Sequence, residues 1–258
     1  MVTVTVLVDN SVRASRPRGL RGEWGFAAAV DGVLLDAGQS GLVADNADRL
    51  GVGPFETVVA SHGHFDHTGG LPAVLDEAER LYCHPDALDP KYRDGEHVGC
   101  PYDRSWLESR VEVVTHVDPV EVAPGVTALG EVPRPHPDNP VGETVADGRR
   151  VPDRVADDQS LAVETGDGVV LVCGCCHAGL RNTIEHAEAV CDAPVRAVVG
   201  GTHLVAADEA AVGEAAALLS DVDRVAACHC TGPAAEERLA SSLGEAFEHA
   251  GVGTALEF

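Results

Sequence analysis

Four apolar segments of the chain each lead directly into a histidine, and this repeated arrangement restricts the possible folds more than any other feature. The four segments are TVVASHGH (57–64), VVLVCGCCH (169–177), VRAVVGGTH (195–203) and RVAACH (224–229). Short runs rich in valine and alanine predict buried β-strands. Because ligands bind at the carboxyl ends of the strands in open α/β sheets, we expect histidines that are far apart in the sequence to meet at one edge of a sheet.

The rest of the chain predicts a single α/β domain that spans residues 1–258. A hairpin with an Asp-Gly turn is expected at residues 25–38, and the patterns of strand and helix alternate from residue 160 onward. Further helices are expected at residues 40–50 and 71–80, and irregular loops at residues 84–110 and 132–159. Strands that alternate with helices indicate a layered α/β protein.

The charge of the chain is strongly one-sided. It contains 42 Asp and Glu residues against 18 Lys and Arg, which gives a formal net charge of −24, and Lys91 is the only lysine. Such a surface repels the phosphates of nucleic acids and of anionic membranes, so we expect neither partner. An acidic surface combined with a near absence of lysine is typical of proteins from salt-loving archaea. An acidic mesophilic protein is the alternative.

Neither a membrane anchor nor a secretion signal is predicted. No apolar run reaches the length of about 18 residues that a membrane span requires, and the N-terminal segment MVTVTVLVDNSV lacks the features of a signal peptide. We therefore expect a cytoplasmic protein. In that setting its eight cysteines are expected to be free thiols. A zinc ribbon built from Cys173, Cys176, Cys228 and Cys230 is the weaker alternative, because Cys173 ends a run that predicts a buried strand.

The loop SHGHFDHTGG (61–70) places three histidines and an aspartate within six positions. His62 and His64 are two residues apart, so in an extended loop they point the same way and can bind one ion. Asp66 and His67 follow where the loop turns into a helix, and they would face a second ion. Two such ions can together hold a phosphate or carbonyl oxygen. We expect one or two divalent metal ions, with zinc as the first choice and manganese or iron as alternatives.

The pattern H-x-H-x-D-H after an apolar strand resembles the signature of the metallo-β-lactamase superfamily. The resemblance implies an αββα four-layer sandwich, in which two mixed sheets are flanked by helices and the metal site lies at one edge. It implies one metal held by His62, His64 and His177, and a second metal held by Asp66, His67 and His229. The segment LLDAG resembles an early motif of the superfamily, which implies a supporting role near the metals for Asp36.

Longer segments resemble one subfamily, whose named members include an archaeal synthase of methanopterin formation. They are LLDAGQSGLVADNADRLG, VLVCGCCHAGLRNTIEHA, AVVGGTHLVAA and ACHCTGPAA. Two residues depart from the usual pattern, since Cys176 stands in place of serine and Thr202 in place of phenylalanine. Many superfamily members also have an aspartate that bridges the metals, and none follows the strand that ends in CGCCH. A bridging ligand is therefore missing, or another group serves instead.

Other candidate residues have less defined roles. Asp66 is also a candidate catalytic residue that orients an attacking water, and His203 is a candidate for a metal ligand or for a catalytic contact with the substrate. Asp157 and Asp158 are weaker candidates, expected to be solvated. The remaining histidines are expected to lie outside the site: His84, His97, His116, His136, His186 and His249.

Three functions fit these features. The resemblance favours a metal-dependent enzyme that acts on a phosphorylated or diphosphorylated small molecule, in particular a transferase that joins an arylamine to a pterin methyl diphosphate. Helix starts at HTGGL, HAGL and TGPAA would add backbone N–H groups that bind such an anion. A hydrolase of phosphoesters or of other esters and amides is the alternative. A non-enzymatic metal-binding or thiol-redox protein would explain the pairs YCHP, CCH and CHC, but not the histidine-rich loop.

Overall fold

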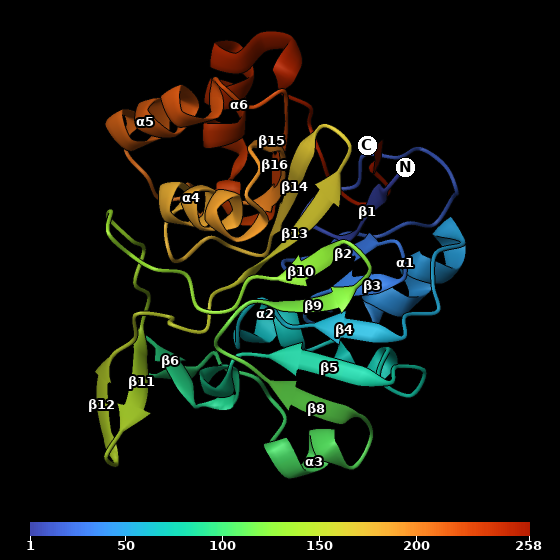
Figure 1. Cartoon of the computed structure of the whole chain (residues 1–258). Coiled ribbons are helices and arrows are strands. Elements are labelled where there is room, and N and C mark those ends of the chain that lie inside the picture. Colours follow the sequence, from blue (N-terminus) through green and yellow to red (C-terminus); the bar gives the residue numbers. More distant parts are fainter.

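The computed structural model describes residues 1–258, and two large β-sheets form its centre (Figure 1). The first sheet has seven strands in the order β17-β1-β2-β3-β4-β5-β8. Their bounds are Ala255–Glu257, Thr3–Val8, Ala27–Val30, Val33–Leu35, Thr57–Val59, Arg80–Cys83 and Glu112–Thr115. The half from β17 to β3 is antiparallel, whereas β3, β4, β5 and β8 run parallel. The sheet is therefore mixed.

The second large sheet has six strands in the order β16-β15-β14-β13-β10-β9. Their bounds are Arg224–Cys228, Val195–Gly201, Gly168–Cys173, Ser160–Thr165, Val126–Ala128 and Val120–Ala123. Strands β14, β15 and β16 run parallel and the others antiparallel. A third, smaller sheet has the order β12-β11-β6-β7, with bounds Arg149–Pro152, Glu143–Ala146, Lys91–Arg93 and Glu96–His97.

Helices cover the outer faces of the two large sheets (Figure 1). The helices are α1 (Leu42–Leu50), α2 (Phe65–Thr68), α3 (Arg104–Glu108), α4 (Leu180–Cys191), α5 (Glu209–Leu219) and α6 (Pro233–Leu243). Helices α4, α5 and α6 lie against the six-stranded sheet, and α1 lies against the seven-stranded sheet. None of the helices combines the length and the apolar composition that crossing a membrane would require.

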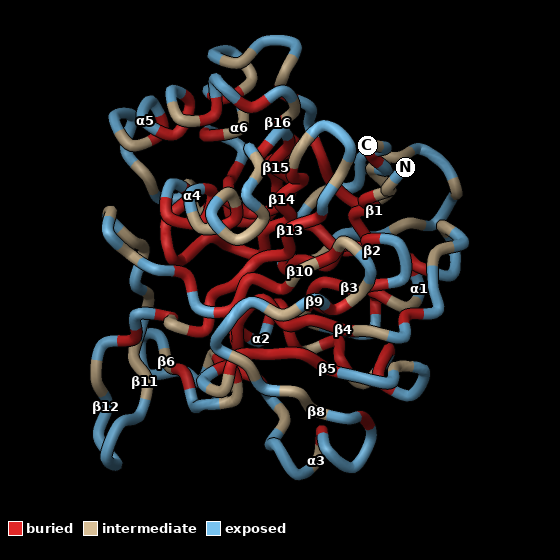
Figure 2. Tube along the Cα trace, in the orientation of Figure 1, coloured by how far each residue is buried: buried red, intermediate tan, exposed pale blue.

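The alternation of side chains along the strands creates three apolar layers. In β14, Val170 and Val172 point into the central core between the sheets, whereas Val169 and Leu171 point outward against the helices. The same alternation sends Ala28 of β2 inward and Ala29 of the same strand toward α1. Figure 2 shows these buried layers as a continuous interior beneath an exposed rim. The predicted αββα sandwich is confirmed.

Two expectations about local structure are wrong. The helix expected at residues 71–80 is a short 3₁₀ turn, Leu71–Ala73, and Arg80 already begins β5. The strand is favoured because Leu81 and Cys83 become fully buried beside β4. The loops expected at 84–110 and 132–159 contain α3 and the third sheet. That sheet is largely exposed to solvent, so its strands lack the apolar alternation by which a strand is recognised in a sequence.

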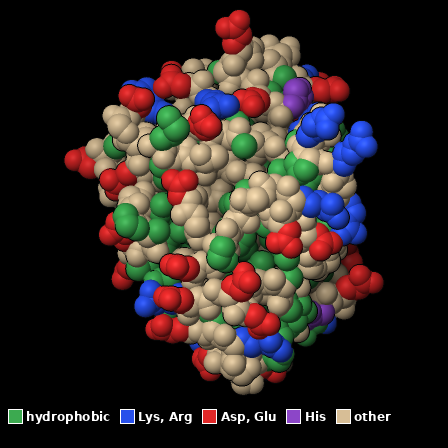
Figure 3. Space-filling model, turned by 90° about the vertical axis from the view of Figure 1, so that its right-hand side faces the viewer, with side chains coloured by type: hydrophobic (Ala, Val, Ile, Leu, Met, Phe, Trp, Pro, Cys, Tyr) green, Lys and Arg blue, Asp and Glu red, His purple; other side chains and the backbone are tan.

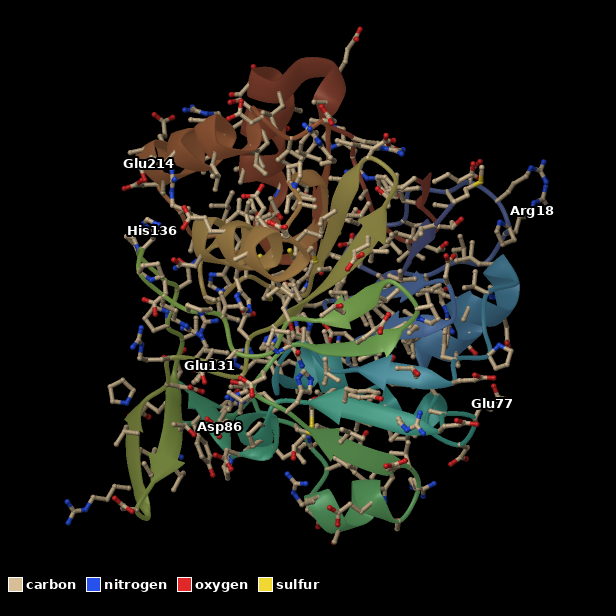
Figure 4. The ribbon with its side chains drawn as sticks, viewed as in Figure 1. Arg18, Glu77, Asp86, Glu131, His136 and Glu214 are labelled. Atoms are coloured by element: carbon tan, nitrogen blue, oxygen red, sulfur yellow. The ribbon has the colours of Figure 1, made fainter.

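Acidic side chains are distributed over the whole surface. Figure 3 shows them scattered across one face among fewer basic groups, and in Figure 4 the labelled Glu77 and Glu214 project from different parts of the molecule. Because the net charge is −24, mutual repulsion should oppose folding at low ionic strength, where screening is weak.

We expect salt to stabilise the chain. Transfer from dilute buffer to molar potassium chloride should raise the free energy of unfolding by at least about 2 kcal/mol, which corresponds to roughly 4–8 °C in melting temperature for a domain of this size. Calorimetry at graded salt concentrations measures the effect. Sucrose serves as the control, since it favours compact states without screening charge. A melting temperature that is the same in dilute buffer and in molar salt would contradict the halophilic interpretation.

Candidate metal centre

The histidine-rich loop follows β4 and is fixed by hydrogen bonds on both sides. The backbone N–H of Ser61 donates to Asp36 Oδ1 at 2.7 Å, and the N–H of Gly63 donates to Asp157 Oδ2 at 2.7 Å. Gly63 is required here because a Cβ atom would lie 2.0 Å from the carbonyl oxygen of Ala87. These contacts hold the loop in a conformation in which His62, His64 and His67 are buried.

His62, His64 and His177 form the first group of candidate ligands. Their donor atoms all lie within 4.8 Å of one another, and His62 Nε2 is 2.8 Å from His64 Nδ1. Burial lowers the pKa of His62 and of His177 well below the usual value and lowers that of His64 to about 4. All three imidazoles are consequently neutral at neutral pH, which is the form that binds metal ions.

Asp66, His67 and His229 form the second group, and their donor atoms also lie within 4.8 Å of one another. His67 Nε2 is 3.2 Å from His229 Nε2, and Asp66 Oδ2 is 3.8 Å from both nitrogens. Burial lowers the pKa of His229 to about 3. Burial also acts to lower the pKa of His67, but the carboxylates of Asp36 and Asp66 together outweigh burial and raise that pKa to about 9.

Asp36 connects the two groups. This fully buried carboxylate lies 2.6 Å from His67 Nδ1 and accepts a hydrogen bond from Ser61 Oγ at 2.7 Å. Ser61 Oγ in turn lies 2.9 Å from His62 Nδ1. Asp36 thus fixes the ring of His67 directly and that of His62 through a hydroxyl, so that Nε2 of both rings faces the site. Carboxylates commonly hold metal-binding histidines in this manner.

The chemistry of both groups fits divalent metal ions. His177 Nε2 is buried and has no hydrogen-bond partner. In each group two ring nitrogens lie close together, at 2.8 Å in the first group and 3.2 Å in the second. A cation bound in each group would accept electron pairs from the ring nitrogens of that group. The structure thus brings together the six residues named as ligands, and metal binding by them remains a prediction.

His203 lies beside the first group without joining it. Its ring centroid is 4.3 Å from that of His177, but His203 belongs to none of the sets of three donor atoms that lie within 4.8 Å. The backbone of His203 has a positive φ of 54°. Three other residues around the site also have positive φ values: Asp36 (61°), Cys176 (58°) and His229 (53°). Left-handed conformations in residues other than glycine are costly and gather at functional sites. The position favours a contact with substrate over metal ligation.

The expectation that Asp157 and Asp158 are solvated is wrong, because both are completely buried. Asp157 accepts from Lys91 Nζ at 2.7 Å in addition to Gly63, so it ties the loop to the third sheet. Asp158 Oδ2 accepts from the N–H of Ala178 at 2.9 Å, and burial raises its pKa to about 7. Both aspartates support the loops that carry the histidines. Sequence could not reveal this, since acidic pairs are common in so acidic a chain.

A cavity of about 160 Å³ opens over the two groups. Its polar wall includes His64, Asp66, His177, His203 and His229. Its apolar wall contains Trp24, Phe65 and Val205, whose exposed fractions of 47%, 37% and 50% are high for such side chains. Arg93 of β6 is the one cationic side chain in the lining, and no carboxylate pairs with it. Sequence patterns gave no reason to select Arg93 or Trp24.

The comparisons with known proteins agree with this geometry. The family model described as the metallo-β-lactamase superfamily matches residues 31–187, which is more than half of the chain. The chain belongs to the metallo-β-lactamase superfamily. Among solved structures, Tm1679, described as a metal-dependent hydrolase of the β-lactamase superfamily, aligns with a TM-score of 0.90 at 28% identity, covering 100% of this chain and 99% of that chain.

Two curated relatives come from the archaeon Methanocaldococcus jannaschii. One is named 7,8-dihydropterin-6-methyl-4-(beta-D-ribofuranosyl)-aminobenzene-5′-phosphate synthase and is 29% identical over 83% of this chain and 79% of its own length. The other is uncharacterised and is 26% identical over 96% of this chain and 98% of its own length. The predicted resemblance to the synthase subfamily is confirmed.

Proposed function

We propose that the chain is a metal-dependent transferase that joins an arylamine to a pterin methyl diphosphate. The observation that carries the proposal is the cavity itself, in which both histidine groups adjoin an unpaired arginine and an aromatic rim. An anionic group and a flat apolar group can bind there side by side. The 29% identity to the named synthase supports this choice of substrates.

The six candidate ligands are proposed to hold two divalent ions, with zinc as the first choice. Bound ions would supply positive charge that stabilises anionic oxygens of the substrate and of the leaving group. Arg93 would add a positively charged guanidinium that binds the same anion, in a protein whose surface otherwise repels anions. Trp24 and Phe65 would contact the flat ring of the pterin.

The proposed reaction is a displacement at carbon. The arylamine nitrogen attacks the methylene carbon, the carbon–oxygen bond to the diphosphate breaks, and the nitrogen loses a proton. His203 is a suitable acceptor of that proton, because it faces the cavity and because burial and the nearby Arg93 lower its pKa and keep it neutral. Asp66 lines the same cavity and can orient the amine.

A hydrolase is the second candidate, supported by the likeness to Tm1679 over the whole chain. In that case a water molecule, oriented by Asp66, would take the place of the arylamine. Both reactions need the same anion-binding cavity, and they differ only in the nucleophile.

The assay measures release of diphosphate from a pterin methyl diphosphate, with and without an arylamine, in molar potassium chloride with zinc or manganese. Release that depends on the amine is the expected result. Release without the amine would favour the hydrolase. No release from this compound, from phosphomonoesters or from phosphodiesters, by protein that retains its metals, would contradict both candidates.

Arg93→Met provides a variant that leaves the metal ligands intact. It should raise KM for the diphosphate about tenfold or more, because a hydrogen bond to a charged group contributes roughly 1.5–3 kcal/mol. Arg149→Met is the matched control, since Arg149 is also exposed and unpaired but does not line the cavity. Equal KM values for the two variants would remove Arg93 from the proposed site.

A further inference from the structure

We propose that the sulfur of Cys175 bridges the two metal ions. In many members of the superfamily an aspartate has this role, but no aspartate directly follows β14 in this chain. The inference rests on the proposed metal-dependent function and concerns the same centre. Cys175 is the second residue after the end of β14, in the turn that leads to His177. It lines the cavity and is almost fully buried.

The position of the sulfur between the two groups carries the proposal. Cys175 Sγ lies 3.4 Å from His67 Nε2, and the donor atoms of His62, His67 and Cys175 all lie within 4.8 Å of one another. His62 belongs to the first group and His67 to the second. The sulfur is also within 4.8 Å of the donor atom of His229. One atom of Cys175 is therefore within reach of ligands from both groups, as a bridging ligand must be.

The residues that orient the histidines also fix the turn that carries Cys175. A Cβ atom at Gly174 would lie 2.1 Å from Ser61 Oγ and 2.9 Å from Asp36 Oδ2, so the backbone before Cys175 packs directly on this hydrogen-bonded pair. After Cys175 the chain turns at Cys176, whose φ is 58°. Close packing and this turn direct the thiol of Cys175 into the site and the side chain of Cys176 into the apolar layer beneath α4.

The other thiols are less suitable. Cys230 Sγ accepts a hydrogen bond from the N–H of His203 at 3.3 Å and lies 3.6 Å from the carbonyl oxygen of Cys175. Cys230 forms a set of close donor atoms with Cys175 and His229 but with no residue of the first group. Cys173 and Cys176 are buried in the apolar layer between β14 and α4. Of the thiols, only that of Cys175 lies within 4.8 Å of donor atoms from both groups.

A bridging thiolate has a consequence for metal choice. Thiolate is a soft ligand that favours zinc, iron and cobalt, whereas manganese and magnesium prefer oxygen ligands. We therefore expect the centre to select zinc or iron over manganese. This narrows the range of metals that the histidines and Asp66 alone would allow.

X-ray absorption of the zinc-loaded protein tests the proposal without any variant. A sulfur that bridges two zinc ions should contribute one sulfur neighbour per zinc at about 2.3 Å. A sulfur bound to one ion alone would give one sulfur for every two zinc ions. Either that lower value or the absence of sulfur neighbours would overturn the bridge. If the folded protein retained no zinc, the proposed function would fail together with the bridge.

Cobalt substitution identifies which cysteine is involved. The wild-type protein should bind two cobalt ions and show a sulfur-to-cobalt charge-transfer band in the near ultraviolet. Cys175→Asp should keep both ions and lose that band, and Cys175→Ala should retain about one ion per chain after dialysis. Cys176→Ser and Cys230→Ala are the matched controls and should keep the band and both ions.

Several outcomes would count against Cys175. A band that persists in Cys175→Asp, or one that disappears in Cys230→Ala, would assign the sulfur to another residue. Two bound cobalt ions without any band in the wild-type protein would leave the metal centre standing and reject the thiolate. If Cys175→Asp failed to fold, the number of sulfur neighbours per zinc, measured by X-ray absorption on the Cys230→Ala variant, would still test the bridge. A value of one sulfur per zinc in that variant would support the bridge.

Discussion

Replacement of His64 by alanine should reduce turnover by about a thousandfold or more while the chain stays folded. The side chain of His64 belongs to the first group and faces the cavity. Its loss should weaken or empty one metal position, and a metal ion stabilises transition-state charge by several kcal/mol. Each 1.36 kcal/mol corresponds to a factor of ten in rate. Turnover at saturating substrate, together with metal content by elemental analysis, measures the effect.

His249→Ala is the matched control, because this histidine lies beyond α6 and belongs to neither group. It should keep full metal content and full turnover. Circular dichroism of both variants should match that of the wild-type protein. If the His64→Ala protein kept more than about a tenth of the original turnover, the first group of histidines would not be required for the reaction. Wild-type protein that binds two metals but turns over no substrate would favour the non-enzymatic alternative.

The convergence of the histidines could be predicted from the sequence because four apolar runs each lead directly into a histidine. Runs of this kind predict buried strands, and ligands bind at the carboxyl ends of such strands. The four apolar runs are strands β4, β14, β15 and β16, and the parallel strands β14, β15 and β16 end at the same side of the six-stranded sheet. The first histidine segment belongs to the seven-stranded sheet and the other three to the six-stranded sheet. The meeting point is thus an edge shared by two sheets, a detail that strand patterns alone do not contain.

The position of Cys175 beside the histidines could not be derived from strand alternation. Alternation along β14 would place Cys173 and Cys175 on the same face of the sheet. The strand ends at Cys173, however, and the chain bends at Gly174, which packs against Ser61. Cys173 consequently faces the helices and Cys175 faces the histidines. The bend at Gly174 therefore decides which way the side chain of Cys175 points. This bend depends on packing against Ser61, a residue distant in the sequence, so the local strand pattern does not reveal it.

Arg93 and Lys91 were missed for a related reason. They belong to the third sheet, whose short polar strands resemble loops in the sequence. Lys91 is the only lysine of the chain, yet its side chain is only 2% exposed. Lys91 Nζ donates to Asp153 Oδ2 at 3.0 Å and to Asp157 Oδ1 at 2.7 Å. Burial acts to lower the pKa of Lys91, but Asp157 and Asp153 outweigh it and raise that pKa.

Replacement of Lys91 by methionine should therefore lower the free energy of unfolding by about 3–5 kcal/mol, because it leaves two buried carboxylates without their cation. Urea denaturation in molar potassium chloride measures the loss. Arg110→Met is the control, since its ion pair with Asp76 is exposed and should contribute about 1 kcal/mol or less.

Adding Asp153→Asn and Asp157→Asn to Lys91→Met should restore part of the stability by removing both charges. The restored protein should still bind metal poorly, because an amide accepts a weaker hydrogen bond from Gly63 than the carboxylate of Asp157 does. A loss of less than about 1 kcal/mol in Lys91→Met would mean that the two aspartates are protonated or hydrated without Lys91, and that the third sheet does not hold the histidine loop in place.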